Sequence, residues 1–365
     1  MKNQIYTLTC TWAPSYGAVL QAYALAKTVQ NLGYDAKVLN YQPRWRNHSV
    51  SPFKKALSPL LSLKDSVFSR QYLDFLYKQN IITNKVYQTN DDLNSADLHA
   101  NAFIVGSDQV WNCTKYYNGK DDAMFLDFAA PNQKRVSYAA SLAMPEVPQV
   151  QADRYKKMLS KFYAISVREQ TGTEALAKIG IENVVTVIDP VYLTDQRDWV
   201  ELAEKGRKDF TKEKYVLIIC LEERDSIYEY ARKKADMLGV KLYSFRGGVK
   251  IYRKYSNIDK IFWNISVYDY LNIINNAEAV VADSFHAMSF SIIFNRDIDI
   301  ILRDDKGNSR MLDLLSDLKI AERVTVPDKI LTKKIDYIKV KQKIADKVTY
   351  ATEFLENAIE GGYDE

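Results

Sequence analysis

Cysteine and histidine are scarce in this chain. Its 365 residues include three histidines and three cysteines, Cys10, Cys113 and Cys220. There is no CxxC pair and no two histidines stand at metal-ligand spacing, which disfavours a zinc or iron–sulfur site. An odd number of cysteines without a pairing pattern also indicates a reducing compartment. We therefore expect a functional site that contains no metal and no other cofactor.

Long hydrophobic runs are also missing. The longest apolar run, Tyr215–Leu221, has the length of a buried strand and falls far below the ~20 apolar residues of a membrane-spanning helix. The opening sequence MKNQIYTLTC is too polar for a signal peptide. We expect a soluble, cytoplasmic protein, with peripheral contact at the inner face of the membrane left open.

An excess of one charge and several common motifs are absent as well. The chain has 50 basic and 46 acidic residues, a net charge of +4 and no long basic tract, which disfavours nucleic acid as a partner. The patterns GxGxxG, GxxxxGK[ST] and GxSxG do not occur. Nicotinamide dinucleotide binding, P-loop nucleotide hydrolysis and a nucleophile-elbow hydrolase are therefore disfavoured.

The chain does contain short apolar strands that alternate with amphipathic helices, a pattern typical of parallel βαβ units. We predict an α/β fold with two Rossmann-like doubly wound domains, residues 1–195 and 210–330, and a C-terminal helix within 331–365. The charged segment 194–214 is interpreted as a linker. The predicted strands are 5–9, 36–39, 102–105, 135–139, 164–167, 184–188, 215–221, 240–245, 279–282 and 298–302, and the predicted helices are 16–32, 67–78, 149–160, 169–179, 226–238, 267–276 and 335–360.

Polar residues follow several of these strands. Ligands of doubly wound sheets bind beyond the carboxyl ends of the strands, so this placement selects the candidate site. Tyr16, Gly17 and Gln21 lie at the start of the first helix, where backbone donors can face an anion. Trp111 and Trp263 could stack on sugar rings, although tryptophans are more often core residues.

The segment VVADSFHAMSF, residues 280–290, is the most informative of these places. It predicts a buried strand, a polar loop at Asp283 and Ser284, and a helix that opens at His286. A helix N-terminus attracts anions, and an imidazole exchanges protons near neutral pH. The alternative is that Asp283 or Ser284 only caps the helix and that His286 is an ordinary surface residue.

Gly106, Ser107 and Asp108 follow the strand 102–105. Glycine tolerates unusual backbone angles, and the carboxylate just after it could orient or deprotonate a substrate hydroxyl. The alternative is a turn in which Asp108 caps the next segment.

Three arginines also follow strands. Arg168 comes directly after 164–167, and a guanidinium is suited to bidentate capture of a carboxylate or phosphate. The alternative is an ion pair with Glu169 or another nearby acid. Arg303 and Arg310 follow the last strand and could add positive charge, but a position in a solvated loop is slightly favoured for them.

Six blocks of the chain, taken in order, resemble the polysaccharide pyruvyltransferase family over roughly residues 6–320. The resemblance implies two Rossmann-like halves similar to GT-B glycosyltransferases. It also implies transfer of a pyruvyl group from phosphoenolpyruvate to two hydroxyls of one sugar, which forms a cyclic ketal. The blocks are YGAVLQAYAL (16–25), FIVGSDQVWN (103–112), VSYAAS (136–141), ISVRE (165–169), VIDPV (187–191) and ADSFHAMSFSIIF (282–294).

The resemblance also implies roles for residues and partners. His286 is expected to be the general acid, Arg168 an anion clamp, and Asp108 the orienter or base for the acceptor. Phosphoenolpyruvate is the co-substrate, and the implied acceptor is a lipid-linked saccharide of capsule or other cell-surface polysaccharide synthesis.

The chain departs from the family at one informative place. Several relatives carry Arg-Leu-His where this chain has Ser284, Phe285 and His286, so one phosphate-binding guanidinium is missing. Ser284 with the helix N-terminus, or Arg303 or Arg310, is expected to take its place.

Two other functions fit the same residues. One is a GT-B-like glycosyltransferase that uses a nucleotide sugar, and the other is a non-catalytic saccharide-binding protein. Stabilisation by phosphoenolpyruvate or by a nucleotide sugar would separate the first alternative, and sugar binding without phosphate release would identify the second.

Overall fold

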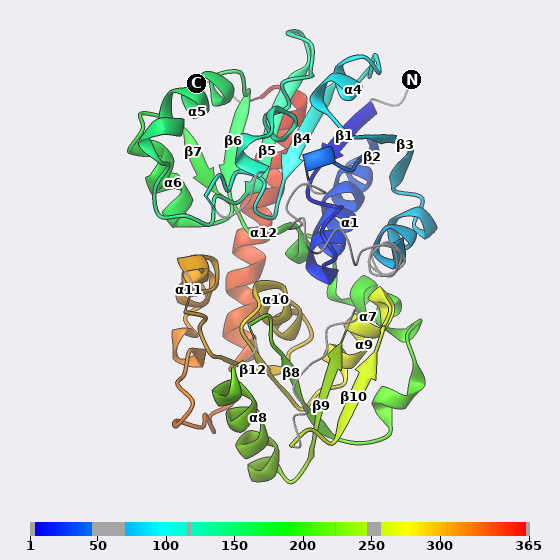
Figure 1. Ribbon diagram of the computed structural model, residues 1–365, viewed down its shortest axis with the longest axis vertical. Helices are drawn as coiled ribbons and strands as arrows, with labels where there is room; N and C mark the ends of the chain where they lie inside the picture. Colours follow the sequence, from blue (N-terminus) through cyan, green and yellow to red (C-terminus); the bar gives the residue numbers. More distant parts are fainter. Residues whose placement is uncertain are drawn as a thin grey trace, which may run out of the picture. The chain divides into compact units, whose positions relative to one another are not determined.

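The chain forms two compact units, each built on its own parallel sheet (Figure 1). The computed structural model describes residues 4–45, 70–114, 118–222, 224–246, 257–304 and 306–362. The first unit comprises residues 1–56, 73–194 and 344–365, and the second comprises 57–72 and 195–343.

The first unit contains a seven-stranded sheet in the order β3-β2-β1-β4-β5-β6-β7, in which every neighbouring pair is parallel. The direction of winding changes between β1 and β4, where doubly wound sheets bind their ligands. The strands are β1 (Gln4–Leu8), β2 (Asp35–Tyr41), β3 (Ile82–Tyr87), β4 (Ala102–Gly106), β5 (Lys134–Ala140), β6 (Ala164–Val167) and β7 (Val184–Thr186).

Helices flank this sheet (Figure 1). Every residue of β4 is buried, as expected for a central parallel strand that helices cover. The elements are α1 (Tyr16–Asn31), a helix over 70–78, α4 (Asn90–Asn94), α5 (Gln149–Leu159), α6 (Gln170–Ala177) and the short 3₁₀ helices η2 (Asn118–Lys120), η3 (Asp122–Phe125) and η4 (Pro190–Tyr192).

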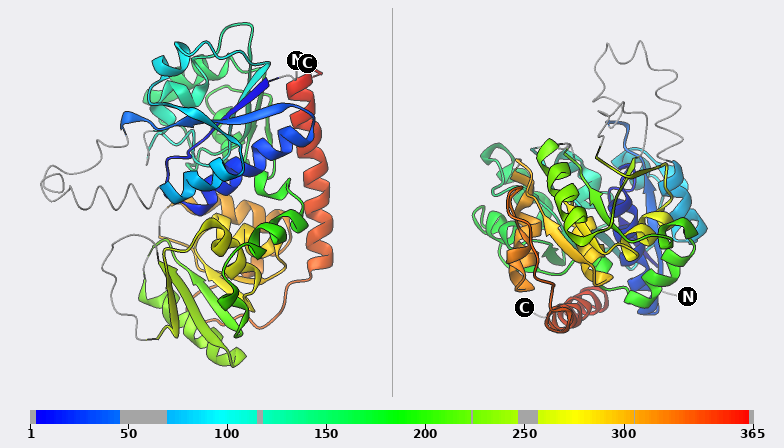
Figure 2. Two further views of the ribbon diagram at one scale, coloured as in Figure 1. Left: turned by 90° about the vertical axis from the view of Figure 1, so that its right-hand side faces the viewer. Right: turned by 90° about the horizontal axis from the view of Figure 1, so that it is seen from below.

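The C-terminal helix α12 (Tyr337–Glu360) is one continuous helix, drawn in red in Figure 2. Its residues from 344 onward belong to the first unit. There the Lys134 ammonium donates to the carbonyl oxygen of Ile359 at 2.8 Å, because a cation is stabilised by the unpaired carbonyls at a helix C-terminus.

The second unit contains a five-stranded, all-parallel sheet in the order β10-β9-β8-β11-β12. Its strands are β8 (Tyr215–Ile219), β9 (Lys241–Arg246), β10 (Lys260–Trp263), β11 (Ala279–Ala282) and β12 (Asp297–Ile300). Its helices are α7 (Gln196–Glu204), α8 (Asp225–Leu238), α9 (Val267–Asn275), α10 (Phe285–Ile293) and α11 (Ser309–Asp317), with the 3₁₀ helices η5 (Lys208–Thr211), η6 (Lys306–Asn308) and η7 (Ala321–Arg323).

The interpretation of 194–214 as a linker is wrong, because this segment contains α7. The Asp195 carboxylate accepts a hydrogen bond from the backbone N–H of Arg197 at 2.7 Å and caps the helix. Trp199 is fully buried and meets Phe290 edge-on, with ring centroids 5.1 Å apart. The charged residues of α7 lie mainly on its exposed face, so composition alone concealed an amphipathic helix.

The other predicted strands and helices occur, with ends that differ by a few residues, and residues 67–69 of the predicted helix 67–78 lie outside the described part. The strands β3 and β10 were not predicted. Both are edge strands, and three consecutive residues of β3 are exposed, so neither has the apolar pattern of a central strand. Among the described residues, none of the helices combines the length and the apolar character that a bilayer crossing requires.

We expect Trp199→Ala to lower the free energy of unfolding by about 3–5 kcal/mol, because it leaves a cavity where a large ring was buried. Trp263, which is 52% exposed, supplies the matched control, and Trp263→Ala should change stability by less than ~0.5 kcal/mol. Urea denaturation followed by circular dichroism measures both. Equal unfolding midpoints for the two variants would contradict the packing described for α7.

Candidate functional site

The loop after β4 has an unusual backbone. A Cβ atom on Gly106 would lie 2.3 Å from the carbonyl oxygen of Tyr138, so glycine is required there by the close approach of β5. The next two residues, Ser107 and Asp108, have positive φ angles of 33° and 61°. The unusual angles were expected at the glycine but occur in the two residues that follow it. Strain of this kind is found mostly where the surrounding contacts fix the backbone.

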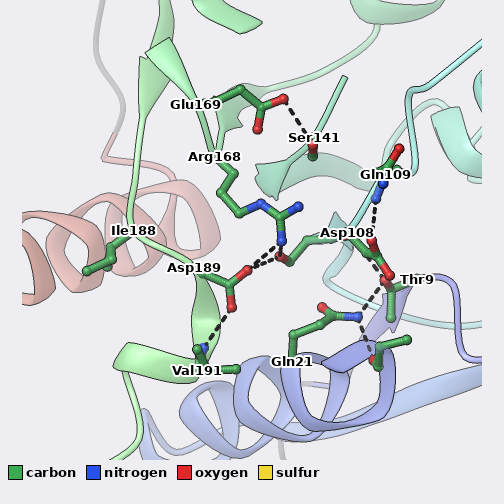
Figure 3. Close-up of polar contacts among 12 residues, drawn as sticks. Thr9, Gln21, Asp108, Gln109, Ser141, Arg168, Glu169, Ile188, Asp189 and Val191 are labelled. Atoms are coloured by element: carbon green, nitrogen blue, oxygen red, sulfur yellow. Dashed lines mark hydrogen bonds and ion pairs between the residues drawn. The ribbon is translucent and has the colours of Figure 1, made fainter. Parts of the chain in front are cut away.

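A buried ion pair provides those contacts (Figure 3). The Arg168 guanidinium donates to the Asp189 carboxylate at 2.7 Å, and the side chains are 1% and 0% exposed. The Ser107 hydroxyl also donates to Asp189, at 2.7 Å, and accepts from Arg168 at 3.2 Å. The second carboxylate oxygen of Asp189 accepts from the backbone N–H of Val191 at 3.1 Å. The loop after β4, the loop after β6 and the start of η4 are thereby linked through one pair of charges.

The partner of Arg168 in this ion pair is therefore Asp189 and not the adjacent Glu169. Burial lowers the pKa of Arg168, but the carboxylates of Asp189, Glu169 and Asp108 outweigh it and raise the pKa above its usual value. The guanidinium is thus charged and already surrounded by acids. This geometry favours the ion-pair interpretation of Arg168, and its role as an anion clamp stays a prediction.

Glu169 accepts hydrogen bonds from the loop that follows β5. One of its carboxylate oxygens accepts three hydrogen bonds, from the Ser141 hydroxyl at 2.9 Å and from the backbone N–H groups of Leu142 at 3.0 Å and Ala143 at 2.9 Å. Glu169 is 1% exposed. It therefore fixes the loop that follows β5, because a buried carboxylate is tolerated only when it is well hydrogen-bonded.

The start of α1 is joined to the same loop. The Gln21 amide donates to the Thr9 hydroxyl at 2.9 Å, and this hydroxyl donates to the carbonyl oxygen of Ser107 at 3.1 Å. Gln21 and Gly17 are buried and Tyr16 is partly buried. Gln21 is thus joined to the Gly106–Asp108 loop through Thr9.

Asp108 is the partly exposed acid of this cluster. Its carboxylate accepts from the backbone N–H of the next residue, Gln109, at 2.8 Å, which is a local contact within the loop. Its carbonyl oxygen accepts from the N–H groups of Val110 and Ser141, both at 2.9 Å. The carboxylate is held at a defined place at the carboxyl edge of the first sheet.

The second unit carries its own cluster at the carboxyl edge of its sheet. Asp283, which follows β11, is 0% exposed and accepts from the backbone N–H groups of Leu221 at 2.7 Å and Glu222 at 3.0 Å. Burial raises the pKa of Asp283, and these two hydrogen bonds offset part of the rise. Asp283 thus links the loop after β8 to the start of α10 and does not act as a helix cap.

Ser284 occupies the N-cap position of α10, but its side chain makes no capping hydrogen bond. The helix begins at Phe285, one residue before the predicted start. His286 lies in its first turn, is 9% exposed and packs edge-on against Phe285 at a centroid distance of 5.3 Å. The alternative interpretation of His286 as an ordinary surface residue is therefore wrong.

Arg310 lies in α11 and is 8% exposed, with its guanidinium carbon 5.9 Å from the centre of the Phe285 ring. The prediction of a solvated loop position is wrong for Arg310, because sequence did not reveal α11. Arg303 does lie in a loop, where Asn308 bonds its backbone at both N–H and C=O, at 3.2 Å and 2.6 Å. Burial still raises the pKa of Asp283, and the positive charges of Arg303 and Arg224 offset a further part of that rise.

Arg224 is a residue that the sequence reasoning missed. Its guanidinium donates to the carbonyl oxygens of Leu302 at 2.8 Å and Ile301 at 3.4 Å, and lies 3.9 Å from the Asp283 carboxylate. It links the loops after β8, β11 and β12. The signal was available, because Arg224 follows a predicted strand as Arg168 does.

Within the ranges that the structure describes, no group of three or more histidine, cysteine, aspartate and glutamate side chains is arranged to hold a metal ion.

Several solved structures share this architecture. A UDP-GlcNAc 2-epimerase from Neisseria meningitidis, bound to UDP-GlcNAc, is 11% identical, with a TM-score of 0.52 over 99% of this chain and 94% of that one. A UDP-GlcNAc 2-epimerase from Methanocaldococcus jannaschii is 10% identical, with a TM-score of 0.52 over 94% and 92%. UGT89C1 of Arabidopsis thaliana, complexed with UDP-L-rhamnose, is 10% identical, with a TM-score of 0.50 over 99% and 94%. At these identities the likeness shows the fold alone.

The two parallel sheets with flanking helices are those of the GT-B type of α/β protein, as predicted. The family model for polysaccharide pyruvyl transferases matches residues 16–296, which is more than half of the chain and includes both Asp108 and His286. The chain belongs to the polysaccharide pyruvyl transferase family. No curated protein matches the sequence.

We expect Asp189→Ala to lower the free energy of unfolding by about 3–5 kcal/mol, because it leaves the Arg168 guanidinium buried without its ion-pair partner. The double variant Arg168→Met with Asp189→Leu removes both charges and should recover most of that loss. Denaturant unfolding of the two variants tests this. A double variant no more stable than Asp189→Ala would contradict the account of the buried charge.

Proposed function

We propose that the protein transfers the pyruvyl group of phosphoenolpyruvate to two hydroxyls of one sugar in a cell-surface polysaccharide precursor and forms a cyclic ketal. The observation that carries the proposal is the family match over residues 16–296, which includes Asp108, Arg168 and His286.

The reaction needs a proton donor and a group that receives hydroxyl protons. Protonation of the methylene carbon of phosphoenolpyruvate produces an oxocarbenium-like centre, which the first sugar hydroxyl attacks. The phosphate leaves, the second hydroxyl closes the ring, and inorganic phosphate is the by-product. Of the two hydroxyl protons, one balances the new methyl group and the other leaves with the phosphate. The balance requires no redox partner, and we propose that no cofactor is needed beyond phosphoenolpyruvate as co-substrate.

We assign the binding of phosphoenolpyruvate, the pyruvyl donor, to the second unit. His286 serves as the general acid, at the carbon or at the leaving phosphate. The first-turn amides of α10, with Ser284, attract the anionic groups because they carry the positive end of the helix dipole. Arg310, stacked on Phe285, and Arg303 add positive charge. These groups are proposed to replace the guanidinium that relatives carry at the position of Ser284.

We assign the binding of the acceptor saccharide to the first unit. Asp108 orients the attacking hydroxyl or removes its proton, supported by the loop that Gly106 and Ser107 form. Arg168 was expected to clamp an anion. Its contacts with Asp189 and Ser107 support a further role, in which it positions the loop that presents Asp108.

The acceptor is proposed to be a lipid-linked saccharide, so that the enzyme would work in the cytoplasm at the inner face of the membrane. Nucleic acid has no part in the reaction.

Two alternative functions compete with pyruvyl transfer. A nucleotide-sugar glycosyltransferase is suggested by two of the similar structures, which contain bound UDP-GlcNAc and UDP-L-rhamnose. A non-catalytic saccharide-binding protein would bind the sugar and release no phosphate.

We expect His286→Ala to reduce phosphate release from phosphoenolpyruvate by about 10²–10⁴-fold in the presence of a glycolipid acceptor, because general acid catalysis contributes on that order. His286→Gln, closer in size, keeps the packing against Phe285 and should show a comparable loss. Mass analysis identifies the ketal product, and circular dichroism confirms that both variants are folded. Near-normal turnover of either folded variant would refute the assignment.

We expect phosphoenolpyruvate at 100 times its dissociation constant to stabilise the protein by about 2.7 kcal/mol, because a ligand that binds only the folded state shifts the folding equilibrium. Thermal shift with phosphoenolpyruvate, UDP-GlcNAc and UDP-L-rhamnose compares the donors directly. Stabilisation by a nucleotide sugar alone would favour the glycosyltransferase instead.

A further inference from the structure

An aromatic cluster lies at the carboxyl edge of the first sheet, outside the residues that the proposed reaction uses. Trp12 follows β1, and Tyr41 and Trp45 stand at and after the end of β2. Trp12 meets both other rings edge-on, with centroids 5.8 Å from Tyr41 and 5.7 Å from Trp45. Tyr41 is buried, whereas the two tryptophans are only partly buried.

A buried carboxylate orients this cluster. Asp121, 8% exposed, accepts hydrogen bonds from the Tyr41 hydroxyl at 2.7 Å and from the Trp45 indole N–H at 2.6 Å. Its other oxygen accepts from the backbone N–H of Ala123 at 3.1 Å. Burial and the Asp121 carboxylate raise the pKa of Tyr41, so this hydroxyl stays protonated and remains a donor. The hydrogen bond from its indole N–H to Asp121 holds the Trp45 ring in one orientation. A ring that is already ordered lowers the entropy cost of binding a ligand against it.

The cluster is joined to the loop that presents Asp108. The Asn118 amide donates to the Cys10 sulfur at 3.4 Å and to the carbonyl oxygen of Gln109 at 3.0 Å, and so links the loops after β1 and β4. Trp45, Trp12 and Asp108 lie in the loops that follow β2, β1 and β4, which are neighbours in the sheet. Neighbouring strands lie about 4.8 Å apart, so these three strand ends span about 10 Å, close to the length of a disaccharide.

We propose that Trp12 and Trp45, the tryptophan pair, form a binding subsite for a pyranose ring of the acceptor saccharide. A pyranose has an apolar C–H face and a rim of hydroxyls. The partly exposed indoles suit the face, while the partly exposed Asp108 and Gln109 on the adjoining loop suit the hydroxyls. The tryptophan pair thus selects a saccharide and holds it beside Asp108. This inference rests on the proposed acceptor, and it adds residues that the sequence reasoning did not single out.

Saturation-transfer NMR on the full chain tests the subsite without the donor, with methyl β-D-glucoside, methyl β-D-galactoside and methyl α-D-mannoside as probes. We expect transfer to the ring C–H protons of at least one glycoside. Trp12→Ala and Trp45→Ala should weaken its binding roughly three- to tenfold, the size of an aromatic contact, while Trp12→Phe should retain part of it. Trp263→Ala tests the competing position, because Trp263 is exposed, belongs to the second unit and was the other exposed tryptophan considered for ring stacking, and it should leave binding unchanged. Circular dichroism shows whether each variant is folded, and Trp12→Phe keeps the test open if an alanine variant is not.

In the turnover assay, the tryptophan variants should raise the acceptor KM and leave both kcat and the phosphoenolpyruvate KM close to their original values. Absence of transfer to every glycoside, equal binding by the folded tryptophan-pair variants, or loss of binding in Trp263→Ala would each overturn the subsite. Sugar binding that depends on the tryptophan pair, without any phosphate release from phosphoenolpyruvate, would instead overturn the proposed reaction and leave the subsite standing.

Discussion

The buried ion pair between Arg168 and Asp189 is the interaction on which the candidate site of the first unit depends. Both side chains are almost completely excluded from solvent, so each charge is tolerated only while the other stays in place. The pair also binds the Ser107 hydroxyl, in the part of the loop where the backbone is left-handed. The strained loop can therefore persist, and Asp108 is presented at a fixed position beyond the sheet.

The second unit meets the same requirement with different residues. Asp283 accepts two backbone N–H groups from the loop after β8, and Arg224 donates to carbonyls of the loop after β12. In both units, buried charges join loops that parallel strands leave side by side, because a buried carboxylate must find donors and those loops supply them. The partly exposed Asp108 and the first-turn His286 are the residues to which the proposed chemistry is assigned.

Much of the fold could be predicted from sequence because its central strands are short, wholly apolar runs. Strands such as 102–105 and 279–282 and the long helices have unambiguous patterns. The segment 194–214 was misinterpreted because α7 exposes its charged residues and buries Trp199. The average composition of the segment does not distinguish the exposed face of such a helix from its buried face. The edge strands β3 and β10 were missed because strands at a sheet edge are half exposed and lose the apolar pattern.

By itself the sequence determined the fold class, the family and the edge of each sheet at which polar residues gather, because periodicity, motifs and strand order are properties of the chain. Only the tertiary structure decided which of those residues form ion pairs or hydrogen bonds with one another. It showed that Arg168 is paired with Asp189, 21 residues away, that Asp283 serves a distant loop, and that Asp121 orients Trp45. A charge that is buried away from water must be paired or hydrogen-bonded. Its partner is therefore a group that the folded chain places next to it, and that group can be distant in the sequence.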